Sequence, residues 1–221
     1  MESAQIFDAI DQQDAERLDA ILSAGADPNS LLGRAPYWRP LEAAIEEMAW
    51  YDGSIELVRL LIRHGADVNA RDGEDRGTPL HAAMSLLDAD LQVEDGPAVQ
   101  RELVQLLLEA GADPNVVRST GESPLRSAVE RGDVETARLL LRFGASATLD
   151  EHGAPCGDTA LTAAARRLDL PMIELLIQGG ADPSAVDEGG RTAIERLPPR
   201  SRSEARRWER AAELLQTAPR G

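Results

Sequence analysis

Few residues of this 221-residue chain could do chemistry. His152 and Cys156 lie four residues apart in EHGAPCG, and an imidazole beside a thiol is the pairing that activates a cysteine nucleophile. That segment is rich in Gly and Pro, and no third group there would orient the imidazole. The other histidines stand in unremarkable places, His64 at the end of an apolar helical stretch and His81 within TPLHAA. We therefore expect a binding protein and no enzyme.

The sequence also offers no convincing metal or cofactor site. DGEDRG (72–77) has the carboxylates of a calcium loop but lacks the terminal Glu at the required spacing. No phosphate-binding Gly loop and no H-E-x-x-H motif is present. The single cysteine excludes an intramolecular disulfide. We expect no metal and no cofactor, and a chain that folds without either.

Composition narrows the classes of partner. The chain has 39 acidic and 23 basic residues and a net charge of −16, which repels nucleic acid and anionic lipid and attracts a basic protein surface. The N-terminus lacks the basic and apolar regions of a signal peptide, and no apolar run approaches the roughly 18 residues of a membrane span. We expect a soluble cytoplasmic protein with no nucleic-acid or membrane partner.

The elements that must position any binding residue repeat along the chain. An apolar stripe at helical spacing precedes each copy of one phrase: GADPN (25–29), GADVN (65–69), GADPN (111–115), GASAT (144–148) and GADPS (180–184). A second phrase lies between these copies: RPLEAA (39–44), TPLHAA (78–83), SPLRSA (123–128), TALTAA (159–164) and TAIERL (192–197). The GA dipeptides are 40, 46, 33 and 36 residues apart, so the base period is 33 with insertions.

Local physical chemistry explains both phrases. Thr78 and Ser123 can cap a helix, and the proline that follows each suits the first helical position, where no amide hydrogen is needed. Ala pairs keep that helix thin, so that the next repeat can stack closely against it. Gly65, Gly111 and Gly144 follow the last turn of a second helix, where a left-handed residue ends a helix at least cost.

Period and phrase together resemble the ankyrin repeat, whose T-P-L-H-x-A signature residues 78–83 match outright. The resemblance covers nearly the whole chain. It implies an all-α ankyrin-repeat solenoid of helix-turn-helix units with short β-hairpin-like finger loops. We expect one domain over residues 1–221, with an N-terminal cap pair at about 3–24, central repeats at about 25–190 and a C-terminal cap pair at about 191–217. In such repeats His81 would tie neighbouring fingers.

The resemblance also implies where a partner docks, because the fingers and first helices line a concave surface. Tyr37 and Trp38 fall just before a helix start and favour a contact surface, since both residue types are enriched in binding hot spots. The alternative is that they cover the edge of the first repeat. The acidic candidates for the same surface are Glu46, Glu47, Asp72, Glu74, Asp75, Glu122, Glu130 and Asp158.

Two alternatives about charge and insertions stay open. An acidic surface also serves ordinary solubility, and residues 191–221, with net charge +4, are expected to form a solvated cap that Trp208 anchors. The insertions at 46–54 and 85–97 either enlarge one binding edge or lengthen helices, with Met48, Trp50, Leu86, Leu87 and Leu91 packing on one another.

We predict a non-enzymatic, protein-binding module, monomeric by itself, that binds a basic protein partner through its acidic concave face and inhibits or sequesters it. By analogy with bacterial ankyrin proteins, one form of this function is an immunity protein that neutralises a cognate toxin. The alternative is a scaffold, adaptor or delivered effector that recruits cellular proteins.

Overall fold

The computed structural model describes residues 2–31, 39–50, 53–71, 77–86, 96–153 and 157–218. The chain divides into two compact units, Met1–Asp113 and Pro114–Gly221, here called unit 1 and unit 2. Both are built of helices, and no strand is assigned within the described ranges. The all-α, helix-turn-helix class predicted from the sequence is confirmed, whereas the single domain stays a prediction.

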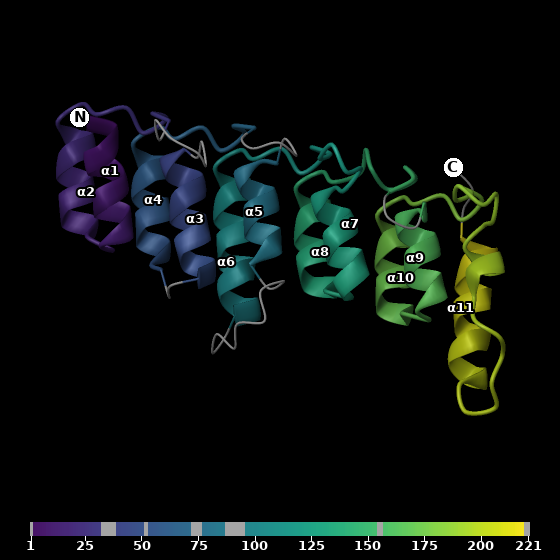
Figure 1. The fold of residues 1–221 in the computed structure, drawn as a ribbon. Helices are drawn as coiled ribbons and strands as arrows, with labels where there is room; N and C mark the ends of the chain where they lie inside the picture. The colour runs from purple at the N-terminus through teal and green to yellow at the C-terminus, as the bar shows by residue number, and fades with distance from the viewer. Residues whose placement is uncertain are drawn as a thin grey trace. The chain divides into compact units, whose positions relative to one another are not determined.

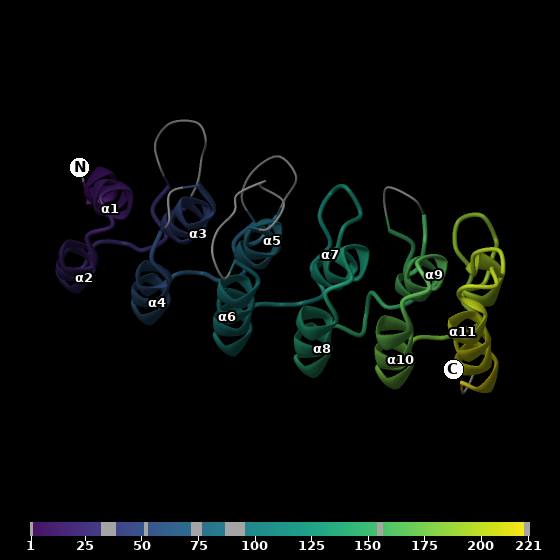
Figure 2. The same cartoon turned by 90° about the horizontal axis from the view of Figure 1, so that it is seen from below.

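Unit 1 contains three helix pairs (Figure 1). Helices α1, α3 and α5 come first in their pairs and form one row, and α2, α4 and α6 form a second row next to it (Figure 2). We call the side formed by α1, α3 and α5 the first-helix side of unit 1. The helices of unit 1 are α1 (Glu2–Asp11), α2 (Ala15–Ser23), α3 (Pro40–Trp50), α4 (Ile55–Arg63), α5 (Pro79–Ser85) and α6 (Gly96–Glu109).

Unit 2 repeats this arrangement with two helix pairs and a C-terminal helix that packs on α10. Its fingers are hairpin-like: the Arg118 backbone N–H donates to the Glu122 carbonyl at 2.9 Å, and Gly153 forms an antiparallel bridge with Asp158. Its helices are α7 (Pro124–Arg131), α8 (Val134–Arg142), α9 (Ala160–Arg166), α10 (Leu170–Gln178), the 3-10 helix η1 (Ile194–Arg196) and α11 (Ala205–Thr217).

The predicted helix starts and stops are present. Thr78 begins α5 in a capping box with His81, and the Ser123 hydroxyl accepts from the Arg126 backbone N–H at the start of α7. Gly65 and Gly144 have φ values of 89° and 91°, the left-handed geometry that other residues adopt only at a cost.

The alanines of the first helices and the leucines of the second helices pack in different ways. Alanines of the first helices, such as Ala44 and Ala83, are 1% and 0% exposed and allow close approach of neighbouring pairs. Leucines of the second helices, such as Leu61 and Leu107, are fully buried and fill the space between pairs. Each such leucine contributes about 1.5–3 kcal/mol by leaving water.

Asparagine side chains join consecutive repeats inside each unit. Asn69 donates from Nδ2 to the Gly111 carbonyl at 3.0 Å and accepts from the Asp113 backbone N–H at 2.8 Å. Asn29 does the same for Gly65 and Asp67, and Asn115 for Gly144 and Ala147. The sequence did not reveal this role, because the partners of each asparagine are distant in sequence.

The insertions lengthen helices at their described ends. Helix α3 has 11 residues and α6 has 14, against 8 in α7 and 9 in α8. Met48 is 7% exposed, and buried Gln100 donates to the carbonyls that end α5. The burial of Met48 agrees with the packing alternative for the first insertion. The middle of the second insertion, residues 87–95, lies outside the described residues.

The C-terminal cap differs from the expected helix pair. Its first member is the three-residue η1, because Pro198 and Pro199 follow after Leu197 and prolines cannot continue a helix. Trp208 is half-buried, and its indole Nε1 donates to the Pro198 carbonyl at 2.9 Å. The expected tryptophan anchor of the cap therefore holds the segment that precedes α11.

Candidate functional site

The predicted contact residues fall into two groups. Tyr37 and Trp38, and likewise Asp72, Glu74 and Asp75, lie outside the residues that the structure describes. The carboxylates of the second group, Glu46, Glu47, Glu122, Glu130 and Asp158, are all described. The first two of these belong to unit 1 and the other three to unit 2, so the structure does not bring the whole set together in one unit.

In unit 1, Glu46 and Glu47 lie half-buried near the end of α3, on the first-helix side. Burial raises the pKa of the Glu47 carboxyl, and the negative charge of Asp11 raises it further. Asp11 ends α1 and is exposed. Two adjacent helices thus place carboxylates close enough to repel each other, and Asp11 is a member of the site that the sequence analysis missed.

The turns next to this acidic pair are tied together. Gln13 follows α1 with φ 54°, an uncommon left-handed conformation for a residue with a side chain, and its Oε1 accepts from the Ser54 backbone N–H at 2.7 Å. Ser54 in turn caps α4. This hydrogen bond joins the turn after α1 to the turn after α3, so Asp11 and Glu47 are held on connected elements.

In unit 2 the predicted carboxylates are paired with arginines. Glu130 accepts from Arg126 Nε at 2.9 Å, one helical turn along α7. Glu122 lies 3.7 Å from Arg118 and also accepts from the Ser127 hydroxyl. These contacts neutralise the negative charge within the unit, so neither glutamate offers an uncompensated anion to a partner.

Asp158 occupies a different place from the exposed finger position expected for it. It is 2% exposed and lies 2.7 Å from Arg166 and 3.9 Å from Arg196. A buried carboxylate requires such pairing, because desolvation otherwise makes its charge very costly. Asp158 therefore stabilises the interior of unit 2. The sequence did not reveal this role, because Arg196 lies 38 residues further along the chain.

The division into units concentrates the charge. Residues 1–113 contain 23 acidic and 8 basic side chains, a net charge of −15, whereas residues 114–221 contain 16 and 15, a net charge of −1. The basic C-terminal residues 191–221, with net charge +4, account for only part of this difference, because the change in charge lies near residue 113. Unit 1 thus carries nearly all of the negative potential that would attract a basic surface.

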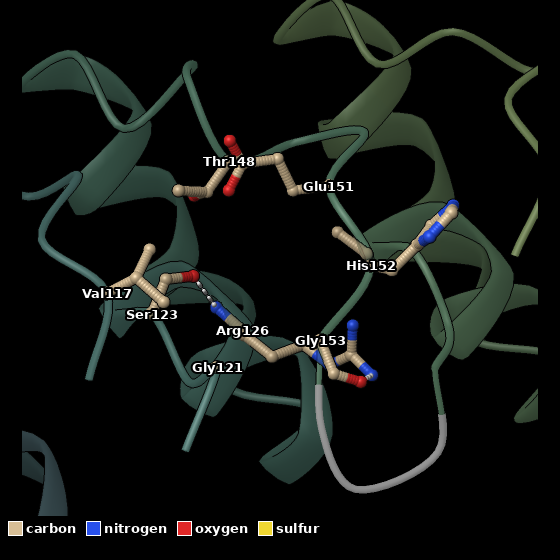
Figure 3. A pocket seen from close by; sticks show the side chains of 9 residues that line it. Val117, Gly121, Ser123, Arg126, Thr148, Glu151, His152 and Gly153 are labelled. Atoms are coloured by element: carbon tan, nitrogen blue, oxygen red, sulfur yellow. Dashed lines mark hydrogen bonds between the residues drawn. The ribbon is translucent and has the colours of Figure 1, made fainter. Parts of the chain in front are cut away.

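Unit 2 contains a small pocket of about 50 Å³ between two consecutive fingers (Figure 3). Its polar lining includes Ser123, Arg126, Thr148, Glu151 and His152, and its remaining lining is Val117, Gly121, Gly153 and Ala160. Arg126 and Thr148 are buried, and Glu151 and His152 are exposed. The pocket lies on the finger side, where the ankyrin resemblance places partner contacts.

The histidines make structural contacts. His64 Nε2 lies 2.8 Å from the Asp19 carboxylate, and the His81 Nδ1 accepts from the Thr78 backbone N–H at 3.2 Å. The predicted tie from His81 to a neighbouring finger is not tested by these contacts and stays a prediction. His152 Nε2 contacts the Val186 carbonyl at 2.7 Å, and Cys156 lies outside the described residues.

The described residues offer neither a metal-binding cluster nor a membrane-spanning helix. No group of three or more His, Cys, Asp or Glu side chains in these ranges could hold a metal ion. Among the described helices, none is long and apolar enough to cross a membrane.

Family models match two stretches of the chain. Residues 97–187 match a model described as ankyrin repeats in three copies, and residues 41–85 match one described as ankyrin repeats in many copies. The matched stretches include α3 to α5 and α6 to α10, so both units are covered.

Curated relatives include proteins of several kinds. The chain is 33% identical over 153 residues to the mouse B-cell lymphoma 3 protein homolog, covering 58% of this chain and 33% of that protein. It is 38% identical over 94 residues to the ankyrin repeat protein YahD of Escherichia coli (strain K12), covering 42% and 43%. A palmitoyltransferase, AKR1 of Lachancea kluyveri, is 33% identical over 63% of this chain and 18% of the enzyme. The chain therefore spans less than half the length of each relative.

Solved structures share the fold. An ankyrin repeat domain from Acinetobacter baumannii AYE has a TM-score of 0.73 and 24% identity, with 96% of each chain covered. A chain from the complex of the predatory endopeptidase Bd0816 with the immunity protein Bd3460, from Bdellovibrio bacteriovorus, has a TM-score of 0.66 and 19% identity and covers 97% of this chain and 98% of that one. At these identities the likeness concerns the fold alone.

Proposed function

Because this chain belongs to the ankyrin repeat family, whose members are protein-interaction modules, we propose that it binds a basic protein partner through the first-helix side of unit 1. The observation that carries the proposal is the unequal charge of the units, −15 in residues 1–113 against −1 in residues 114–221. A basic partner would associate rapidly with such a surface under electrostatic steering.

Glu47 and Asp11 are the described centre of this surface. The raised pKa of Glu47 records an energetic penalty for placing its charge in a partly buried site beside Asp11. A guanidinium or ammonium group of a partner would offset that repulsion. The pair would therefore favour the binding of a cationic side chain at this surface. Tyr37 and Trp38 lead into the same helix, α3, and are proposed to anchor the contact.

The consequence proposed for the partner is inhibition or sequestration, as in an immunity protein that neutralises a toxin. Support for this finer step is limited to the fold shared with a chain of the endopeptidase–immunity protein complex. A scaffold or adaptor that recruits cellular proteins is the second candidate, and the vertebrate and yeast relatives that carry the same repeats inside longer proteins favour it.

The test compares three full-length proteins as baits for affinity capture, followed by measurement of association rates with the captured partner. The double variant Asp11→Arg with Glu47→Arg should lose most of the partner and should associate at least about tenfold more slowly at low salt. The matched control, Glu16→Arg with Glu56→Arg, makes the same change in net charge on α2 and α4, and both residues are exposed. Equal loss in both double variants would show that only the overall charge matters and would overturn the docking surface.

A second measurement, of the partner's own activity, distinguishes inhibition from recruitment. If the partner is an enzyme or a toxin, a stoichiometric amount of this chain should abolish its activity. A partner that stays fully active in the complex would contradict inhibition and leave recruitment as the function.

A further inference from the structure

The pocket of unit 2 contains a buried hydroxyl that the fold leaves without a partner. Thr148 is 7% exposed, and its Oγ1 has no hydrogen bond within the described part of the chain. An unsatisfied buried hydroxyl costs stability, because it has lost its water and gained nothing in exchange. A threonine retained at such a cost points to a ligand that completes its hydrogen bonding.

The other walls of the pocket are fixed by the interior of unit 2. Arg126 is 5% exposed and donates to the Glu130 carboxylate, to the Asp158 carbonyl and to the Gly153 carbonyl. The absence of a side chain at Gly153 is necessary for this, since a Cβ there would lie 2.9 Å from Arg126 Nη1. The Arg126 side chain is therefore held in place by these hydrogen bonds, and the Glu130 carboxylate compensates its charge. It does not provide an uncompensated cation for an anionic ligand.

The opposite side of the pocket offers an acceptor. Glu151 extends across it towards Thr148, while Ser123 and Arg126 lie on the other side (Figure 3). The Glu151 carboxylate makes no hydrogen bond or ion pair with any other described residue. The Ser123 hydroxyl accepts from the Arg126 backbone N–H, so its own hydrogen is left to donate.

The pocket therefore presents hydroxyl donors and a carboxylate acceptor within a small space. An anion would be repelled by Glu151, and an ammonium or guanidinium cation, which can only donate, would offer no acceptor to the hydroxyl hydrogens of Thr148 and Ser123. A neutral planar group with one acceptor oxygen and an NH₂ donor satisfies both sides. The volume of about 50 Å³ exceeds the roughly 10–15 Å³ that one water needs, so it admits a group of a few heavy atoms.

We propose that this pocket binds a primary carboxamide, with the carbonyl oxygen accepting from Thr148 and Ser123 and the NH₂ group donating to Glu151. The chemistry has two sources, the side chain of Asn or Gln on a protein partner and a free small amide. This site is separate from the acidic surface of unit 1, and the proposal does not depend on the function suggested for that surface.

The first experiment is a titration of the ¹⁵N-labelled full chain with acetamide, acetate or methylammonium, followed through backbone amide shifts. Acetamide should produce saturable shifts at Gly121, Ser123 and residues 148–153, with a dissociation constant in the millimolar range. Acetate and methylammonium should not. Absence of saturable shifts, or equal shifts with either ion, would overturn the carboxamide assignment.

Peptides distinguish the two sources. Gly-Gly-Asn-Gly-Gly should bind more tightly than acetamide if the natural ligand is a partner side chain, and Gly-Gly-Asp-Gly-Gly should not bind. If acetamide binds and the Asn peptide does not, the ligand is a free amide.

Variants separate a ligand site from a structural one. Thr148→Val keeps the shape of the side chain and removes the hydroxyl, so the melting temperature should be unchanged or raised while acetamide binding falls at least about tenfold. Thr217→Val, at an exposed position of α11, is the matched control and should bind as the wild type does. A marked fall in the melting temperature of Thr148→Val would mean that the hydroxyl holds structural water, and the proposal would fail.

Discussion

Asp150 takes the place in unit 2 that asparagine holds in the other repeats: its carboxylate accepts from the Asp182 backbone N–H at 3.0 Å. Asn115 both donates and accepts at the preceding junction, whereas a carboxylate can only accept. Burial raises the pKa of Asp150, the hydrogen bond from Asp182 lowers it, and the negative charge of Asp182 raises it again. This junction therefore lacks the side-chain donation that asparagine provides at the other junctions.

Asp150→Asn should stabilise the protein by about 1 kcal/mol at pH 7, since the amide restores a donor and removes the repulsion by Asp182. Because the pKa of Asp150 is raised on folding, its penalty exists above the folded-state pKa and disappears as the pH falls below it. The advantage of the variant over the wild type should shrink in acid, and denaturant melts at several pH values measure it. Asn115→Asp is the control and should destabilise; a variant no more stable than the wild type at pH 7 would contradict the account.

Arg196→Met should destabilise unit 2 by about 3 kcal/mol, because it leaves the buried carboxylates of Asp187 and Asp158 without this partner. The exposed pair of Arg200 and Glu209 provides the comparison, and Arg200→Met should cost less than about 1 kcal/mol. Thermal melts of both variants decide the matter. Equal effects would show that burial does not distinguish the two pairs.

The same ion pair predicts how unit 2 responds to acid. The hydrogen bond from Arg196 is the largest influence lowering the pKa of Asp187, which burial opposes. A lowered folded-state pKa means that the stabilisation is complete above the ordinary carboxyl pKa and is lost as the pH falls through the folded-state value. Acid melts below about pH 4 should show this loss in the wild type and a smaller one in Arg196→Met.

Glu47→Gln should raise stability slightly and weaken binding to a basic partner. The gain in stability is limited to a few tenths of a kcal/mol, because the side chain is only half-buried and solvent screens its repulsion by Asp11. The raised pKa means that this gain is present at neutral pH and vanishes as the wild-type carboxyl protonates. Glu56→Gln, exposed on α4, should change neither property. A variant that binds as tightly as the wild type would remove Glu47 from the proposed surface.

Trp38→Ala distinguishes a binding anchor from edge packing. If Trp38 is an anchor, the variant should lose about 2 kcal/mol or more of binding free energy and keep most of its stability. Calorimetry with the captured partner and a separate thermal melt provide the two numbers. Normal binding with a much lower melting temperature would assign the tryptophan to the seam between repeats.

The sequence by itself determined the repeating architecture, because that information is local. Capping at Thr78 and Ser123, the left-handed glycines at Gly65 and Gly144, and the apolar stripes all act within one helix pair, and each appears in the structure as expected. The repeated architecture could be inferred because the same caps, glycines and apolar stripes recur along the chain.

Only the tertiary structure decided which charges remain available to a partner. The pairing of Asp158 with Arg196 joins residues 38 positions apart, and the proximity of Asp11 and Glu47 joins 36. A count of charges along the chain treats all of these carboxylates alike. Their free energies differ because charge–charge interactions and desolvation depend on distance and burial in space, and those quantities exist only once the repeats have stacked.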